Sequence, residues 1–168
     1  LNYWQFGDYL GIGAGAHGKV TLPHERRILR YNKSRLPRDY LQRDSCCVAG
    51  QYDLADADLP FEFMMNALRL AQGVPGTLFA QRTGLPLEAI EPLWRDLQAR
   101  GLVVEGGAQL ATSPRGFLFL NDVLAAAKKY YKPSNRTVGV FVPDAAPDRT
   151  VVAETPDINK LLSGYKGK

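Results

Sequence analysis

Glycines gather in one short stretch near the start of the chain, and their spacing is one that can serve a bound ligand. Residues 13–18 read GAGAHG and match G-x-G-x-x-G, the pattern in which backbone amides cradle the pyrophosphate of a dinucleotide. That chemistry requires the glycines to open a helix whose N-terminus faces the phosphates. Residues 19–22 instead read as a short strand that stops at Pro23. We therefore expect a glycine-rich strand end that forms part of a pocket wall.

Histidine and cysteine are too few for a metal site. His17 and His24 are the only histidines, and the two cysteines, Cys46 and Cys47, are neighbours. No H-E-x-x-H or C-x-x-C spacing is present, so the sequence predicts no zinc site and no disulfide framework. His17 either lines a pocket beside the glycines or is a loop histidine held by the backbone, and the sequence leaves both readings open.

The residues around the glycines read as strand and loop. Two short runs, residues 19–22 and 27–31, are separated by Pro23-His24-Glu25, which is typical of a turn between strands. Fewer than about 45 residues with this many glycines cannot bury a complete core. This first region therefore has to rest on another part of the protein.

Residues 58–127 carry the clearest periodicity. The first expected helix begins at Asp58 or Pro60, ends at Gly73, and has apolar residues at helical spacing, namely Phe61, Met64, Met65 and Leu68. Thr77 is expected to cap a second helix that runs to residue 82 and closes at Gly84. The third opens at Pro86 and stops at Gly101, with an apolar face formed by Ile90, Leu93, Trp94 and Leu97.

A hairpin and a last helix complete this region. Residues 102–105 and 109–112 flank Gly106-Gly107, a two-residue turn between strands. Ser113 and Pro114 then start a helix whose apolar residues are Phe117, Leu120, Val123 and Leu124. Helix, helix, helix, hairpin, helix is the order of a winged-helix domain, so the sequence predicts that fold here.

The charges of the winged helix argue against DNA as its partner. The third helix and its end carry three acidic residues, Glu88, Glu91 and Asp96, against Arg95 and Arg100. The expected wing adds Glu105 and no basic residue. Because binding to DNA phosphates requires cations, we expect no nucleic-acid partner. A non-catalytic winged-helix module that binds protein is an alternative function.

The remaining composition sets the general class. Residues 1–127 hold 13 basic and 13 acidic side chains, whereas residues 128–168 hold 8 and 4, which is the whole net charge of +4. No apolar run reaches the roughly 18–20 residues of a membrane helix, and no signal peptide opens the chain. We expect a cytoplasmic protein without a membrane span. Because Leu1 is not a methionine, we also expect the chain to be a piece of a longer protein.

Several motifs in the right order give a resemblance to a known family. They are NYW at 2–4, DYLGIGAGAHGK at 8–19, RYN at 30–32, PRDY at 37–40, FEFMMNALRL at 61–70, RTGL at 82–85, GL at 101–102 and GFLFLN at 116–121. Over about residues 1–127 the chain resembles the C-terminal part of the oxygen-independent coproporphyrinogen III oxidase family. Its nearest branch is the radical-SAM haem chaperones.

The resemblance implies an α+β fold in two units. Residues 1–57 would be the end strands of a partial TIM-like radical-SAM barrel, and residues 58–127 the winged-helix C-terminal domain. The family uses S-adenosylmethionine, a 4Fe–4S cluster on a C-x-x-x-C-x-x-C motif, and haem or porphyrin. That cysteine motif is absent here. The missing N-terminal barrel is thus an implied partner, and the isolated chain is expected to hold no cofactor and to be inactive alone.

The resemblance also implies a binding surface but no catalytic residue and no metal ligand. The glycine stretch would form a pocket wall for S-adenosylmethionine or porphyrin, through Gly11, Gly13, Gly15, Ala16 and His17. Substrate-binding residues would be Arg30, Tyr31 and Asn32. The basic residues of 19–43 either lie near a carboxylate-rich substrate, which arginine pairs with well, or merely solvate a hairpin. In the intact protein the function would be haem binding and transfer or porphyrinogen decarboxylation.

The tail resembles a different family. Residues 131–143, YKPSNRTVGVFVP, together with PDR at 147–149 and GYKG at 164–167, are similar to a segment of pitrilysin/insulinase-type zinc peptidases. The H-x-x-E-H zinc motif of those peptidases is absent. We interpret residues 128–168 as a short, strand-containing, peptidase-like tail, either chimeric or a natural fusion. Its strand is expected at residues 137–142, where three valines alternate with Gly139 and Phe141. A zinc peptidase fragment is the last alternative function, and only this tail supports it.

Overall fold

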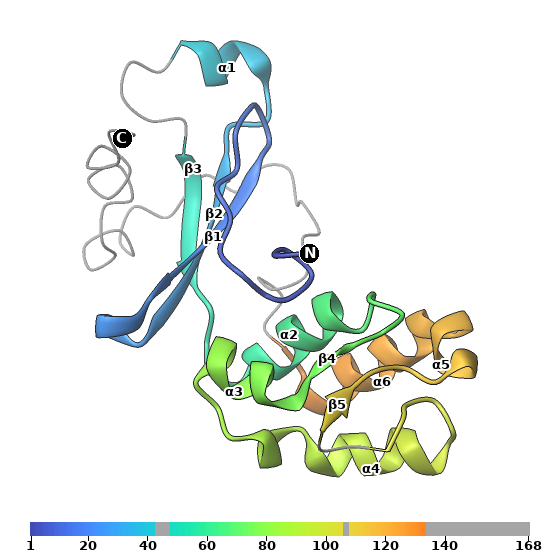
Figure 1. Ribbon diagram of the computed structural model, residues 1–168. Coiled ribbons are helices and arrows are strands. Elements are labelled where there is room, and N and C mark those ends of the chain that lie inside the picture. The colour runs from blue at the N-terminus through green and yellow to red at the C-terminus, as the bar shows by residue number, and fades with distance from the viewer. Residues whose placement is uncertain (43–47, 106–107, 134–168) are drawn as a thin grey trace.

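The computed structural model describes residues 1–42, 48–105 and 108–133, which form a sheet region and a helical region (Figure 1). The sheet region comprises β1 (His17–Leu22), a 3-10 turn η1 (Pro23–Glu25), β2 (Arg27–Lys33), α1 (Pro37–Leu41) and β3 (Val48–Asp53). The helical region comprises α2 (Leu59–Ala67), β4 (Val74–Pro75), α3 (Gly76–Thr83), η2 (Leu87–Ala89), α4 (Glu91–Ala99), β5 (Gln109–Leu110), α5 (Pro114–Leu118) and α6 (Leu120–Tyr131). The chain is therefore a mixed α+β protein, as expected.

The three strands form an antiparallel sheet in the order β1-β2-β3. The two predicted strands and the turn between them are confirmed, and Arg26 closes the turn in the left-handed region at φ 51°. The strands of a TIM-like barrel run parallel and are joined by helices. β1 and β2 are instead joined by a tight turn and run antiparallel, and β3 pairs antiparallel with β2. This pairing does not confirm the expectation of barrel-end strands in residues 1–57, which stays a prediction.

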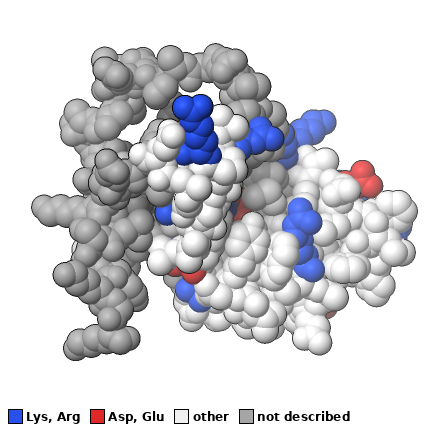
Figure 2. All heavy atoms as spheres, turned by 90° about the horizontal axis from the view of Figure 1, so that it is seen from above, with Lys and Arg blue, Asp and Glu red and all other residues white. Residues whose placement is uncertain are grey.

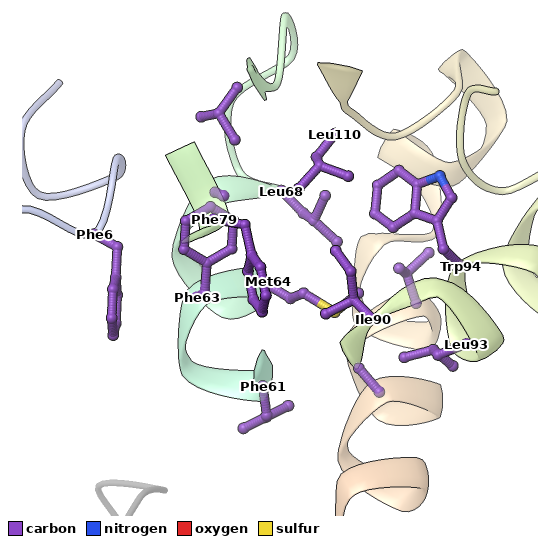
Figure 3. Packing of buried hydrophobic residues seen from close by; sticks show 14 of the residues in the cluster. Phe6, Phe61, Phe63, Met64, Leu68, Phe79, Ile90, Leu93, Trp94 and Leu110 are labelled. Carbon is purple, nitrogen blue, oxygen red and sulfur yellow. The ribbon is translucent and has the colours of Figure 1, made fainter. Parts of the chain in front are cut away.

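The core of the helical region gathers around α2 (Figure 3). The predicted apolar face of this helix is confirmed for Phe61, Met64 and Leu68, which are buried, whereas Met65 is only partly buried. Phe63 also points into the core and packs edge-on against Phe79 of α3, with ring centroids 5.2 Å apart. Such aromatic pairs add stability beyond the area that they bury.

The N-terminal segment contributes to the same core. Phe6 is fully buried and packs edge-on against Phe63, with ring centroids 5.9 Å apart. Ile28 of β2 and Leu54, just after β3, belong to the same cluster. The sheet region therefore rests on the helical region, which agrees with the expectation that it cannot bury a core of its own.

Helix ends in this region differ in detail from the prediction. Gly84 and Gly101 follow α3 and α4 with φ of 74° and 68°, which confirms both as stop positions because glycine adopts this region without strain. Thr77 does not cap α3, since that helix begins at Gly76 and has no side-chain cap. Pro86 opens the short turn η2, and the helix itself begins only at Glu91.

The predicted hairpin is partly confirmed. Val103 and Thr112 form an antiparallel bridge, and the Val104 N–H donates to the Ala111 carbonyl at 3.1 Å. The expected turn at residues 106–107 lies outside the described residues. The second arm also pairs with β4, where Val74 lies opposite Leu110. This pairing ties the hairpin to the turn between α2 and α3.

The last helix is broken once and then runs on to Tyr131. The backbone bends at Phe119, between α5 and α6. α6 continues without interruption to Tyr131, and the Tyr131 hydroxyl donates to the Ala89 carbonyl at 3.2 Å. Residues 128–131 are thus part of the helical region and not of a separate tail.

The strand expected at residues 137–142 lies outside the described residues. Within the described ranges, no helix is long and apolar enough to cross a membrane.

Candidate functional site

The backbone amides of the glycine stretch are already occupied by the protein. The Gly11 N–H donates to the Tyr31 hydroxyl at 3.0 Å, and the Gly13 N–H donates to the Tyr40 hydroxyl at 3.2 Å. The Gly15 N–H donates to the backbone carbonyl of Ser34 at 2.8 Å. Amides that are used in this way cannot also cradle a phosphate. The geometry agrees with the sequence in giving these glycines no dinucleotide site.

Two glycines are required by close approach of neighbouring atoms. A Cβ at Gly18 would lie 2.1 Å from the Tyr31 ring, and a Cβ at Gly11 would lie 2.2 Å from the His17 carbonyl. Gly18 and Tyr31 are direct partners in the β1–β2 ladder, and the tyrosine ring occupies the space beside Gly18 that a side chain would need. The buried Tyr31 then reaches Gly11 with its hydroxyl. Tyr31 therefore positions the glycine stretch.

Gly18→Ala should lower the free energy of unfolding by about 1–3 kcal/mol, because a methyl group has no room beside the Tyr31 ring. Gly50→Ala is the matched control in the same sheet, since its Cβ would meet only the Asn32 side chain, at 3.1 Å. Urea unfolding followed by circular dichroism measures both. Equal midpoints for the two variants would contradict the packing described here.

The glycine stretch and α1 lie at one end of the sheet and present an apolar and basic surface. We call this surface the loop end; its exposed apolar residues are Leu10, Ile12, Leu36 and Leu41. Ile12 and Leu41 are 86% and 78% exposed. Lys33, Arg35 and Arg38 add basic groups, with Asp39 as the acidic residue of α1. Figure 2, which looks down on the molecule from above, shows lysine and arginine side chains on this side and few acidic ones.

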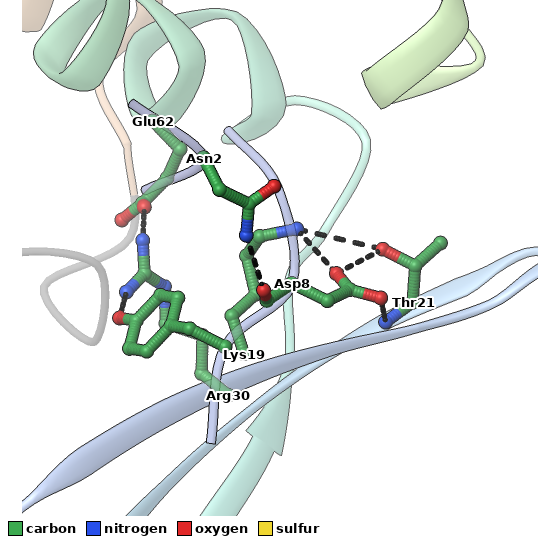
Figure 4. Close-up of polar contacts among 7 residues, drawn as sticks. Asn2, Asp8, Lys19, Thr21, Arg30 and Glu62 are labelled. Carbon is green, nitrogen blue, oxygen red and sulfur yellow. Dashed lines mark hydrogen bonds and ion pairs between the residues drawn. The ribbon is translucent and has the colours of Figure 1, made fainter. Parts of the chain in front are cut away.

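Arg30 faces the helical region and not the loop end. Its guanidinium donates through Nη2 to Glu62 Oε2 of α2 and through Nη1 to the Tyr9 hydroxyl at 2.9 Å (Figure 4). The Glu62 side chain is completely buried. Burial raises the pKa of Glu62, and the adjacent guanidinium offsets part of that rise. Arg30 and Glu62 thus form an internal ion pair that joins the sheet to α2.

A second polar cluster anchors the N-terminal segment to β1. The buried Lys19 ammonium donates to Asp8 Oδ1 at 2.9 Å and lies 4.3 Å from the centre of the Phe6 ring. The Thr21 hydroxyl and backbone N–H donate to the two Asp8 carboxylate oxygens at 2.7 and 2.8 Å. The Asn2 side chain donates to the Asp8 carbonyl at 2.7 Å. Together these contacts hold residues 2–8 against the sheet (Figure 4).

Asp8 should make folding stability depend on pH in the acid range. Burial raises the pKa of Asp8, but the hydrogen bonds from Lys19 and Thr21 outweigh it and hold the pKa below the ordinary 3.8. A lowered pKa in the folded state means that this stabilisation is present above the unfolded pKa and is lost as the pH falls through the folded one. In the Asp8→Asn variant, the free energy of unfolding should therefore change less with pH below about pH 4. Urea unfolding at several pH values measures this change. An unchanged acid slope would contradict this role.

The structure brings together only part of the site that was inferred from sequence. Gly11, Gly13, Gly15, Ala16 and His17 lie at the loop end, and exposed His17 faces Asn32 across the β1–β2 ladder. Neighbouring residues on a strand point to opposite faces, so Tyr31 supports the glycines while Arg30 contacts α2. Sequence reasoning missed Glu62 and Asp8, although a carboxylate between Phe61 and Phe63 was a signal of a buried charge.

The other side chains that could bind a metal ion are His24, Cys46 and Cys47. His24 lies exposed in the turn η1, and Cys46 and Cys47 lie outside the described residues. Among residues 1–42, 48–105 and 108–133, no three histidine, cysteine or acidic side chains are grouped so that they could hold a metal ion.

Comparison with known proteins identifies relatives for most of the chain. Residues 54–119 match the HemN C-terminal domain. The chain is 44% identical over 124 residues to the heme chaperone HemW of Escherichia coli, which is 74% of this chain and 32% of that protein. Identity to the Haemophilus influenzae heme chaperone HemW is 39% over 124 residues, with the same shares. Bacillus subtilis heme chaperone HemW is 26% identical over 127 residues, 75% of this chain and 33% of that protein. No solved structure matches.

These matches agree with the family that the sequence motifs indicated. The aligned length is greater than the matched domain, so the similarity extends beyond residues 54–119. The chain spans about a third of the length of these relatives. The peptidase resemblance of residues 128–168 finds no support among the matches. Residues 54–119 therefore carry a HemN C-terminal domain, and the chain is similar to heme chaperone HemW proteins over about three quarters of its own length.

Proposed function

We propose that this chain is the C-terminal part of a radical-SAM haem-pathway protein and that it helps that protein to bind haem. The observation that carries the proposal is the 44% identity to a heme chaperone over three quarters of the chain. Because the relatives compared above are heme chaperones by name, haem binding and transfer is favoured over porphyrinogen decarboxylation. The winged-helix protein-binding module remains the alternative when the chain is considered alone.

The loop end has the chemistry that a haem or porphyrin needs. A porphyrin has a flat apolar ring and carboxylate side chains at its edge, so it favours an apolar surface bordered by cations. The exposed Leu10, Ile12 and Leu36 supply the apolar part, and Lys33 and Arg38 can pair with carboxylates. His17 at the same end offers an imidazole, a common ligand of haem iron.

S-adenosylmethionine and the iron–sulfur cluster fit this chain less well. The amides of Gly11, Gly13 and Gly15 are engaged by Tyr31, Tyr40 and Ser34, so they are not open to the cofactor. A 4Fe–4S cluster needs several spaced thiolates, whereas the two cysteines of this chain are adjacent. We propose that an N-terminal radical-SAM barrel supplies both groups and that residues 1–57 adjoin it as an antiparallel extension.

We further propose that residues 58–131 form a winged helix that does not bind DNA. The order α2, β4, α3, α4 and the paired arms 103–112 supports the fold. Both arginines of α4 and its end are paired with acidic residues one turn away, Arg95 with Glu91 at 3.0 Å and Arg100 with Asp96 at 3.4 Å. Such pairs weaken any attraction for phosphates.

Hemin titration tests the haem proposal. The sequence alone predicts that the isolated chain holds no cofactor. Because the loop end exposes apolar and basic side chains, we instead expect the isolated chain to bind hemin weakly, seen as a shifted Soret band. Ile12→Asp combined with Leu36→Asp should weaken binding by about tenfold or more, because two apolar contacts are lost. His17→Ala should move the Soret band. Leu118→Asp, in α5 and away from the loop end, is the matched control. Equal affinity of all variants would contradict haem binding here.

A further inference from the structure

A second surface, distinct from the loop end, is a groove beside the last helix. It has a volume of about 730 Å³ and lies between α6, the start of α5 and the residues that follow α4. Leu102, Phe119, Ala125 and Ala126 form its apolar part. This volume is within the range of protein binding sites. None of the residues that the haem proposal uses lines this groove.

The groove is built on a rigid support. α5 approaches the preceding loop so closely that a Cβ at Gly116 would lie 1.7 Å from the Leu102 carbonyl. The Ser113 hydroxyl donates to the Gly101 carbonyl at 2.7 Å and accepts from the Gly116 N–H at 2.9 Å, which caps α5. The helix so fixed and the residue after it present Phe117, Leu118 and Phe119 to solvent, and of these Phe119, which is 51% exposed, lines the groove. Large apolar side chains held outward on a rigid element are typical of an interaction surface.

The charges around the groove are mainly positive. Arg100, Arg115 and Lys129 line it, together with one acidic residue, Asp122. Arg100 is paired with Asp96, whereas Arg115 and Lys129 form no salt bridge within the described part of the chain. An occupant with carboxylates would complement both of these cations.

The shape of the groove favours a helix. Its α6 side is formed by residues 122, 125, 126 and 129, which is the i, i+3, i+4, i+7 stripe of a helix face. The central pair, Ala125 and Ala126, has small side chains that let a second helix approach closely. We propose that this groove binds an acidic amphipathic helix of a partner protein, with apolar residues against Phe119 and the alanines and carboxylates beside Arg115 and Lys129.

A designed peptide tests the proposal on the whole chain. The probe is a synthetic helix of about five turns, with leucines on one face and glutamates on the other. A lysine-for-glutamate version of the same peptide is the control probe. We expect the acidic peptide to shift amide resonances of residues 100–102 and 119–129. The basic peptide should bind about tenfold more weakly or not at all, because its charges oppose those of the groove.

Charge reversal on the protein separates the groove from other surfaces. Arg115→Glu with Lys129→Glu should weaken binding of the acidic peptide by about tenfold, and the basic peptide should then bind better. Arg95→Glu with Lys128→Glu makes the same charge change at residues that do not line the groove and should leave binding unchanged. Equal binding of both peptides, shifts that map elsewhere, or a self-associating chain that covers the groove with a second copy would overturn the proposal.

Discussion

Replacing Arg30 with methionine should lower the free energy of unfolding by about 3–5 kcal/mol, because Glu62 is then left buried without its partner. The pair links β2 to α2, so the loss should appear as one cooperative shift of the urea midpoint in both fluorescence and circular dichroism. The difference in the free energy of unfolding between Arg30→Met and the unaltered protein should become smaller as the pH falls. An unpaired buried carboxyl has a strongly raised pKa, and protonation makes it neutral in the folded state.

Two further variants make this expectation specific. Arg27→Met removes an arginine from the same strand that pairs with Glu25 and Asp53 at the surface, and such exposed pairs contribute about 0–1 kcal/mol. Arg30→Met with Glu62→Leu removes both buried charges and should recover most of the loss, because apolar side chains of similar volume can replace a buried pair. A double variant as unstable as Arg30→Met alone would contradict this account of the ion pair.

The sequence predicted the helical region well because its signals are local. The apolar spacing of Phe61, Met64 and Leu68 and the stops at Gly84 and Gly101 depend only on residues a few positions apart. The α+β class and the two strands around residues 23–25 followed from the same kind of pattern. The break at Phe119 was not predicted. It lies near the close approach of Gly116 to the Leu102 carbonyl, a contact that only the folded chain shows.

The sheet and the candidate site were harder to predict because they depend on contacts distant in sequence. β3 was not expected, since residues 48–53 mix small and polar side chains and form a strand by pairing with β2. Arg30 was assigned to a substrate, but its partner Glu62 lies 32 residues away. The roles of Tyr31 and Tyr40 as supports of the glycine stretch likewise appear only when the chain is folded.

Trp94→Ala should also cost about 3–5 kcal/mol of stability, for a different reason. The indole is only 3% exposed, packs in the core beneath the hairpin, and donates from Nε1 to the Val104 carbonyl at 3.1 Å. Its removal leaves a cavity and an unpaired carbonyl together, so the hairpin arms should exchange amide hydrogens faster as well.

Trp4→Ala is the natural control, since Trp4 is the only other tryptophan and is 36% exposed. Because Trp4 lies near Arg69 at the surface, its loss should cost less than about 1 kcal/mol. Thermal and urea unfolding of both variants give the comparison, and similar losses for the two would mean that Trp94 is not the central side chain of the helical core.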